Sequence, residues 1–412
     1  MPYDLNAVRA EFPALRVSDD GRPRIYFDGP GGTQVCRRAI DGMVAHLTSG
    51  TANSGGAFAS GIATDALSEA AHEAMADLLG GRADEIAFGL NMTSLTLSVA
   101  RALGRPFFAN DEIVLSRLDH DANVAPWLLL ARDKGLTVRW LDFRPSDGRL
   151  DVDSLPNLLG PRTRIVAVGL ASNALGTVND IHRIAEIVRK RCKALLFVDA
   201  VHAAPHLAID VATLGADLLV CSPYKFFGPH AGVLWGRAAL LGEIEAYKVR
   251  PAAEQPAAVR FETGTPSFEA QAGTLGAIEH LAWVGTTMGQ PSGQDRRAAL
   301  LAAMATITGY EAGLAAMLLE GLLKLPKVKL YGPATLEDRV PTFGFTVAGH
   351  TPDAVAAALA ARGICAWSGN FYAREAIIRL GLEASGGLVR VGLMHYNTVD
   401  EVEQLLTVLG EL

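Results

Sequence analysis

The sequence has few of the features that mark several large classes of protein. Its 412 residues include four cysteines and no C-x-x-C pair, so neither a zinc site nor a disulfide framework is indicated and a reducing cytoplasm is expected. The net charge is −7, without a long basic run. Nucleic-acid binding is therefore not expected, because phosphate recognition needs clustered Lys and Arg. The first residues lack the long apolar core of a secretory signal.

Long apolar runs are also missing, although half of the residues are apolar. A membrane span needs about 18 consecutive apolar residues, and no run reaches that length. The G-x-G-x-x-G fingerprint of dinucleotide-binding enzymes does not follow the first strand, because DGPGGTQ lacks the spacing. The expected partner is a small molecule or another protein.

What the sequence does contain is an alternation of short β-rich apolar runs with helical patterns, which is typical of βαβ units and a mainly parallel sheet. Seven runs are predicted as strands, at residues 85–89, 112–116, 137–143, 164–170, 194–200, 218–222 and 232–236. Among the helices between them, one is predicted to begin at a Thr64/Asp65 cap and to stop at Gly80 and Gly81.

The pattern changes after a Gly/Pro/Gln-rich stretch at residues 286–297, the best candidate for a domain boundary. A long Ala/Leu-rich helix then runs to Leu325, and the chain ends with a helix that has a capping box from Thr398 to Glu401. We therefore expect an α/β protein with a large domain at residues 21–285. A smaller α+β domain is predicted from residues 1–20 and 297–412.

Chemically useful side chains follow five of the predicted strands. Because ligands of an open parallel sheet bind outside the carboxyl ends of its strands, these side chains are expected to share one edge. In chain order they are Asn91, Thr93, Ser94, His120, Asn173, Asp199, His202, Ser222, Tyr224 and Lys225. The set supplies hydroxyls at a helix start, an imidazole, an amide, a carboxylate and an amine, which predicts one site.

Lys225 stands in an apolar stretch, although lysine is among the residues least often buried. A partly buried lysine loses its proton more easily and can form a Schiff base with an aldehyde cofactor. Asp199 would hold the nitrogen of a pyridine ring protonated, which makes pyridoxal phosphate (PLP) an electron sink. Helix N-terminal amides, with the hydroxyls of Thr93 and Ser94, would bind the phosphate. These residues predict carbanion chemistry on PLP.

Five segments in the same order resemble the class V aminotransferase family of PLP enzymes, in particular its cysteine desulfurase and selenocysteine lyase branch. They are LDHDANVAPW, ASNALGT, VDAVHAAPH, CSPYKFFGP and RFETGTPS. The resemblance covers nearly the whole chain, including FPAL…IYFDGPGGTQ near the start and GLVRVGLMHYNT near the end. It implies the PLP-dependent transferase fold type I.

The resemblance also implies roles for individual residues. The catalytic and ring-binding set would be Lys225 as the Schiff-base lysine and proton acceptor, Asp199 on the pyridinium, His120 stacked on the ring, and Asn173 and His202 at the phenolic oxygen. The phosphate would be held by Thr93, Ser94, Ser222 and Tyr224, and by Thr265 of the neighbouring subunit in a homodimer. Arg390 would bind the carboxylate of a small amino-acid substrate, a task suited to its bidentate fork.

The segment of this sequence that corresponds to the sulfur-accepting loop of the desulfurases departs from the family pattern. After GICAWSG the spacing places Tyr372 where the family carries its catalytic cysteine, and Cys365, seven positions earlier, is predicted to lie in a strand. Trp367, Asn370 and Phe371 replace the arginine and histidines of that loop. The lyase framework is therefore expected to be intact and the persulfide machinery absent or rebuilt, with Tyr372 lining the substrate pocket or only packing.

Other interpretations remain open. Lys225 alone suggests a solvated loop charge, Asn173 a turn cap, His202 a helix-start cap and Arg390 a solvent-facing strand residue. The function is predicted to be a desulfurase-like C–S or C–Se lyase. The same site also suits an aminotransferase or an amino-acid epimerase. A nucleotide-binding dehydrogenase or a non-catalytic scaffold is the alternative of a different class.

Overall fold

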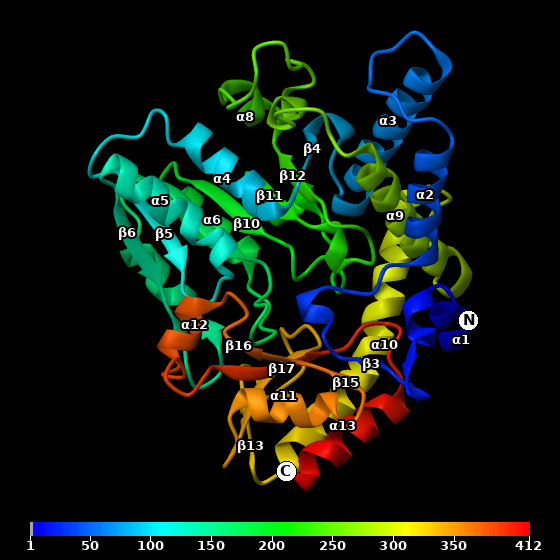
Figure 1. The fold of residues 1–412 in the computed structure, drawn as a ribbon. Coiled ribbons are helices and arrows are strands. Elements are labelled where there is room, and N and C mark those ends of the chain that lie inside the picture. The colour runs from blue at the N-terminus through cyan, green and yellow to red at the C-terminus, as the bar shows by residue number, and fades with distance from the viewer. Residues whose placement is uncertain (1–2) are drawn as a thin grey trace.

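The computed structural model describes residues 3–412, and its largest element is a seven-stranded sheet (Figure 1). Neighbouring strands follow the order β4-β12-β11-β10-β9-β5-β6. Their bounds are β4 Ile86–Gly89, β12 Gly232–Gly236, β11 Leu218–Cys221, β10 Leu195–Asp199, β9 Thr163–Gly169, β5 Glu112–Ser116 and β6 Thr137–Leu141. Only β12 runs antiparallel to its neighbours. All seven predicted strands and the mainly parallel sheet are confirmed.

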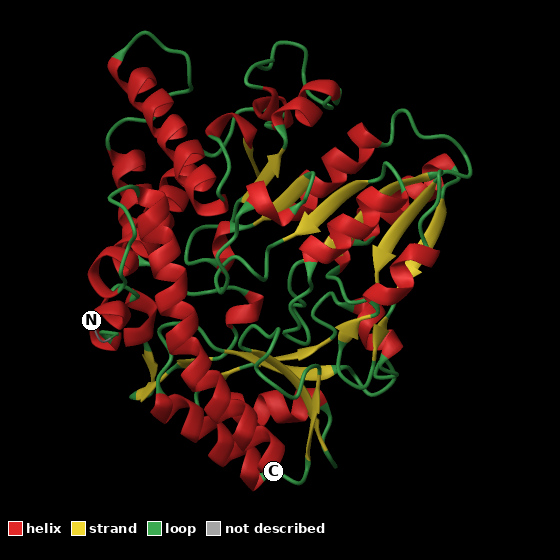
Figure 2. Ribbon diagram, turned by 180° about the vertical axis from the view of Figure 1, so that it is seen from behind, coloured by secondary structure: helices red, strands yellow, loops and turns green. Residues whose placement is uncertain are grey.

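Both faces of this sheet are covered, which explains the continuous apolar runs of its central strands. On β9, Val166 and Val168 belong to one hydrophobic cluster and Ile165 and Ala167 to another, because successive side chains of a strand point to opposite faces. Figure 2 shows the surrounding helices from behind. Major helices packed around the sheet are α3 Ala59–Leu79, α4 Met92–Leu103, α5 Ala125–Lys134, α6 Ile181–Arg191 and α9 Phe268–Met288.

Helix α3 begins earlier than its sequence predicts. Its N-cap is Phe58, and Thr64 lies inside the helix, where its hydroxyl donates to the carbonyls of Ala52 and Ser60. The predicted Thr64/Asp65 cap is therefore wrong. A buried threonine that satisfies its hydroxyl within the helix does not need the cap position. The predicted stop is confirmed, since Gly80 adopts the left-handed conformation at the C-cap.

A second, four-stranded antiparallel sheet lies in the lower part of Figure 1. Its order is β13 (Val328–Tyr331), β14 (Thr342–Val347), β17 (Leu388–Gly392) and β16 (Trp367–Gly369), with α11 (Pro352–Ala360) and α13 (Val399–Glu411) packed nearby. The short β15 (Ile364–Cys365) pairs with β3 (Ile25–Tyr26), so an early segment of the chain joins this region. The Thr398–Glu401 capping box of α13 is confirmed.

Helix α10 (Arg296–Lys324) confirms the predicted long helix and links both cores. Its first half supplies Ala303 and Ile307 to the main hydrophobic cluster, and its second half supplies Leu318 and Leu322 to the cluster around the small sheet. By length and composition alone α10 could also cross a membrane, which is weak evidence because a core helix passes the same test. The absence of a membrane span and the domain boundaries stay predictions.

The remaining elements are short, with one exception. Helix α2 (Arg37–Thr48) packs against α9. The shorter helices and paired strands are α1 Leu5–Ala10, α7 Val211–Leu214, α8 Ala238–Glu243, α12 Arg374–Arg379, β1 Ser18–Asp19, β2 Arg22–Pro23, β7 Phe143–Arg144 and β8 Arg149–Leu150. Of these, α12 matters most for function, because it follows the loop that borders the candidate site.

Candidate active site

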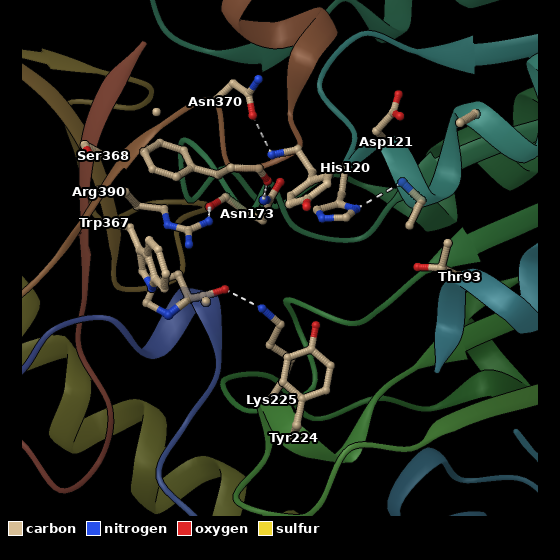
Figure 3. A pocket seen from close by; sticks show the side chains of 17 residues that line it. Thr93, His120, Asp121, Asn173, Tyr224, Lys225, Trp367, Ser368, Asn370 and Arg390 are labelled. Atoms are coloured by element: carbon tan, nitrogen blue, oxygen red, sulfur yellow. Dashed lines mark hydrogen bonds between the residues drawn. The ribbon is translucent and has the colours of Figure 1, made fainter. Parts of the chain in front are cut away.

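A cavity of about 840 Å³ is lined both by loops that follow strands of the large sheet and by residues of the small sheet. A smaller hollow of about 50 Å³ adjoins it and reaches Asp199 and His202. Five predicted site residues line both spaces: Thr93, His120, Asn173, Tyr224 and Lys225. Figure 3 shows that Lys225, Arg390 and His120 approach the cavity from different sides. The structure therefore brings most of the predicted site residues together.

Lys225 follows β11 in a short helical turn and is only 8% exposed. Its Nζ donates to the carbonyl of Pro30 and lies 4.9 Å from the centre of the Tyr224 ring. Burial, reinforced by the charge of Arg390 and opposed by Asp199, lowers the pKa of Lys225 to about 7. The interpretation as a solvated loop charge is wrong. The amine can be neutral, and so nucleophilic or basic, near neutral pH.

Asp199 ends β10 and points into the inner hollow. One of its carboxylate oxygens, Oδ1, accepts from the backbone N–H of Val201 at 2.8 Å, and burial raises the pKa of the carboxyl to about 6 despite the charge of Lys225.

Nearby, His202 Nε2 lies 2.9 Å from Thr342 Oγ1. Burial holds the pKa of His202 well below its usual value. His202 is thus a neutral ring at the cavity floor, bonded to β14 through Nε2.

His120 presents a neutral, oriented ring. Its Nδ1 accepts from the backbone N–H of Ala122 at 3.0 Å, which leaves the proton of the neutral ring on Nε2. Burial, with the charges of Lys225 and Arg390, lowers its pKa to about 3. The phenol of Tyr372 stacks on it. A flat uncharged ring in this position suits the predicted stacking role.

Hydrogen bonds link Arg390 to Asn173, and Asn173 to the loop between β16 and α12. Arg390 Nη1 donates to the Asn173 carbonyl at 3.0 Å, and Asn173 Nδ2 donates to the carbonyl of Phe371 at 2.8 Å. Burial lowers the pKa of Arg390 to about 9, with Asp28 opposing the shift, so the guanidinium stays charged at pH 7. It lies on the buried strand β17, and its solvent-facing interpretation is wrong.

The residues present fit the predicted cofactor. Asn173 Oδ1 and Arg390 Nε are buried polar atoms without a hydrogen-bond partner among residues 3–412. Such atoms are rare in native proteins and call for a ligand or another explanation. A phenolic hydroxyl can donate to Asn173 Oδ1, and a carboxylate can accept from Arg390 Nε. Asp199, which lines the adjoining hollow, and Lys225 supply the other two groups that PLP chemistry needs. These are a carboxylate for the pyridine nitrogen and an amine for the aldehyde.

Only two of the residues predicted to bind the phosphate line the cavity. Thr93 in the first turn of α4 and Tyr224 line the cavity. Ser222 is fully buried, and its hydroxyl accepts from the Met92 N–H at 3.3 Å, so it steadies the start of α4. Ser94 belongs instead to the capping box of α4. Together with the exposed Thr265, it lines a separate surface pocket of about 420 Å³.

The loop between β16 and α12 is held in an unusual conformation. Phe371 and Tyr372 both have positive φ angles, 54° and 58°, which are uncommon for bulky side chains. The backbone N–H of Asp121 donates to the Tyr372 carbonyl at 2.6 Å, and the Tyr372 N–H donates to Asn370 Oδ1 at 3.0 Å. Strained backbone of this kind persists only where surrounding contacts fix it, and it clusters at functional sites.

Cys365 lies in β15, as predicted, and is not among the residues that line the cavity. Burial raises the pKa of its thiol, so it is not an activated thiolate. Tyr372 does line the cavity and is 72% exposed.

Two elements of the site were missed by sequence reasoning. Pro30 and Gly31 enter the cavity from the DGPGG turn. The glycines of this turn were the sequence signal for a close approach to another segment. A Cβ at Gly31 would lie 2.6 Å from the indole nitrogen of Trp367. Asp119 is a second buried carboxyl at the inner hollow. One of its oxygens accepts from Asn123, and the other has no partner in the part of the chain that the structure describes. Its position directly before His120 was the only clue.

Comparison with known proteins identifies the family. Residues 25–405 match the family described as Aminotransferase class-V, so the chain belongs to it. The Aminotransferase-like protein FGM3 of Gibberella zeae is 32% identical, over 99% of this chain and 98% of that protein. Probable cysteine desulfurase 1 of Mycobacterium leprae is 32% identical, over 100% of this chain and 65% of that protein. The apo cysteine desulfurase of Thermococcus onnurineus superimposes with a TM-score of 0.87 at 26% identity, over 100% and 98% of the two chains.

Family membership settles the class of enzyme. Class V aminotransferases are PLP-dependent enzymes with the type I transferase fold, so the predicted family, fold, enzyme class and cofactor are confirmed. The relatives also place the chain on the cysteine desulfurase-like side of the family. The roles of individual site residues stay predictions, supported by the geometry described above.

Proposed function

We propose that this protein is a PLP-dependent lyase that cleaves the C–S or C–Se bond of a small amino acid without a protein thiolate as sulfur acceptor. One observation carries the proposal: Lys225 lines both the cavity and the adjoining hollow, with Arg390 and Tyr372 in the first and Asp199 in the second, and no described lining residue of either is a cysteine. Lys225, Arg390 and Asp199 supply the groups that α-proton removal on PLP requires.

Each residue has a task in this scheme. Bound PLP supplies an electron sink for the electron pair of the Cα–H bond. Arg390 holds the substrate carboxylate through its charged fork. Lys225 takes the α-proton, helped by a pKa near 7 that leaves much of the amine neutral at physiological pH. Asp199 would stabilise a proton on the pyridine nitrogen, and His120 would offer the cofactor ring a neutral imidazole face.

The missing thiolate determines the products. Desulfuration to alanine leaves a sulfur atom at the oxidation level of elemental sulfur, which a cysteine thiolate must accept as a persulfide. Without that acceptor, sulfur leaves with its bonding electrons as sulfide or a thiolate, and the carbon skeleton becomes pyruvate and ammonium. We therefore propose elimination rather than sulfur transfer. Transamination is an outcome that the product analysis separates.

A homodimer is part of the proposal. Thr265 is exposed and shares a surface pocket with Ser94, outside its own chain's cavity. Leu90, which lines the same pocket as Thr265, is a large apolar side chain that is 78% exposed, so covering it in a subunit contact would be favourable. Sedimentation equilibrium should give twice the chain mass. Thr265→Ala should weaken PLP retention without changing that mass, and a monomer that retains full activity would contradict this part.

The experiment that tests the reaction begins with purified holoenzyme. It should show a visible absorption band that shifts on borohydride reduction and is lost or displaced in Lys225→Ala. Cysteine, cysteine sulfinate and selenocysteine are then supplied, and pyruvate, alanine, ammonium and sulfide are measured. Pyruvate and sulfide support elimination. Alanine with protein-bound persulfide would overturn the proposal, and a 2-oxo acid that depends on an amino acceptor would assign a transaminase.

A further inference from the structure

Three aromatic side chains border the cavity where the sequence departs from the desulfurase pattern: Trp367, Phe371 and Tyr372, named here the aromatic wall. Trp367 is 53% and Tyr372 72% exposed. A substrate group packed on these rings would remove their apolar surface from water, which is favourable. The loop also holds two of them in strained backbone, so their placement is maintained against an energetic cost.

The wall lies beside the group expected to bind the substrate carboxylate. Trp367 on β16 is the direct cross-strand partner of Arg390 on β17, and paired residues of neighbouring strands project to the same face. The Phe371 ring lies 4.3 Å from the Arg390 guanidinium. Lys225 approaches from a different side (Figure 3). A carboxylate on Arg390 with its α-proton toward Lys225 therefore leaves the substrate side chain directed along the wall.

Charge and space restrict what that side chain can be. Arg390 and Lys225, the cationic groups of the cavity, are engaged with the α-carboxylate and the α-proton. The wall itself is uncharged and Asp121 lines the same cavity, so an acidic substrate side chain finds no partner along the wall. The cavity of about 840 Å³ lies within the range of about 300–1,000 Å³ over which pockets hold drug-sized ligands, so its volume admits a substituent on the cysteine sulfur. Trp367 cannot retreat toward Gly31, which it already touches closely enough that a Cβ there would clash. The wall thus suits a neutral, flat or apolar substituent.

We propose that the substrate is an S-substituted cysteine, a thioether whose sulfur carries a neutral aromatic or apolar group packed on Trp367 and Tyr372. This inference rests on the proposed lyase function and names its substrate class. Lys225 takes the α-proton, the Cα–H electrons form a Cα=Cβ bond, and the Cβ–S bond breaks with its pair on sulfur. The thiolate takes up a proton to leave as a thiol. Water converts the remaining enamine to pyruvate and ammonium, so no oxidant or sulfur acceptor is needed.

Kinetics on holoenzyme test the substrate class. S-benzyl-L-cysteine, S-methyl-L-cysteine and cysteine are compared by pyruvate and thiol release, and kcat/KM should be at least about tenfold higher for the benzyl compound. Trp367→Ala should reduce that preference about tenfold, while Trp367→Phe, which keeps a ring, retains most of it. Tyr247→Ala removes an exposed aromatic outside the cavity and should leave all three rates unchanged.

Binding supplies a second readout that does not depend on turnover. In the Lys225→Ala background, calorimetry should show tighter binding of S-benzyl-L-cysteine than of S-methyl-L-cysteine, with the difference lost in the Lys225→Ala/Trp367→Ala double variant. Equal turnover of the three amino acids, or equal binding of the two S-substituted cysteines, would overturn the substrate class while leaving the lyase function intact. If no sulfur amino acid yields pyruvate from PLP-loaded enzyme, the lyase function itself fails.

Discussion

The phenol ring of Tyr372 stacks on the imidazole of His120, with centroids 5.5 Å apart and planes inclined by 27°. His120 is also fixed by the Ala122 N–H on Nδ1, so one ring of the site is oriented from two sides. The Tyr372 backbone is tied to Asp121, the residue after His120. The loop from the small sheet and the loop from the large sheet are thereby coupled at the cavity.

Tyr372→Ala tests this coupling. Removing the phenol frees one face of His120, so kcat should fall severalfold, whereas Tyr372→Phe keeps the stack and most of the activity. Because Tyr372 is largely exposed, the free energy of unfolding should change by only about 0.5 kcal/mol. Steady-state kinetics and urea unfolding measure the two effects. Equal kcat for all three proteins would show that the stack has no catalytic role.

Lys225→Ala removes both the amine and its positive charge, whereas Lys225→Arg removes the amine but keeps a positive charge. Both variants lose a group that can be neutral near pH 7, so turnover should fall by about 10²–10⁴-fold. Borohydride-treated wild-type protein should carry the reduced cofactor on the peptide that contains Lys225, as mass spectrometry can detect. Labelling of another lysine would refute the assignment.

Arg390→Lys tests carboxylate recognition. Lysine keeps the charge but lacks the bidentate fork, so KM for the amino acid should rise by about 10- to 100-fold, the range that one charged hydrogen bond supplies. The effect on kcat should be smaller, because the proton acceptor is unchanged. A substrate series at fixed pH checks this. An unchanged KM would place carboxylate binding elsewhere.

Asp119→Asn should alter the pH dependence of stability. Burial and the charge of Asp199 raise the pKa of Asp119 to about 7, above the value of about 3.9 expected in the unfolded chain. Between these values the folded state holds a proton that the unfolded state has released, so stability falls as pH rises from about 4 to 7. The loss amounts to as much as about 4 kcal/mol.

Urea unfolding of cofactor-free wild type and Asp119→Asn at pH 5 and pH 7.5 makes the comparison. The variant should lose less stability over this interval, because its amide does not titrate and can still accept the hydrogen bond from Asn123. A decrease of the same size in both proteins would show that other buried carboxyls, such as Asp28 and Asp199, account for the pH dependence.

Gly31→Ala probes the contact between the early turn and the aromatic wall. An added Cβ would lie 2.6 Å from Trp367 Nε1, so the indole must move and KM should rise. Gly242→Ala is the matched control, because a Cβ there meets nothing within 4 Å. Its KM should equal that of the wild type, and an equally unaffected Gly31→Ala would show that the indole position is not critical.

The strand pattern allowed most of the large sheet to be predicted, because buried parallel strands are read from local apolar runs. The same logic located Lys225, Asp199 and His120 at strand ends, where the fold of an open sheet gathers them. It did not locate Pro30 or Trp367, which enter from segments far away in the chain. The start of α3 was also mistaken, because a threonine can satisfy its hydroxyl inside a helix as well as at its cap.

The sequence by itself determined the family, the strand order along the chain, the cofactor and the absence of a cysteine at position 372, since all of these depend on residue identity and spacing. Only the tertiary structure decided that Lys225 and Arg390 are buried with shifted pKa values, that Ser94 lies outside the cavity, and that Tyr372 stacks on His120. Burial and ring stacking depend on the positions of several segments at once. Local sequence cannot specify those positions, because they are fixed only when the two sheets and the connecting helices pack together.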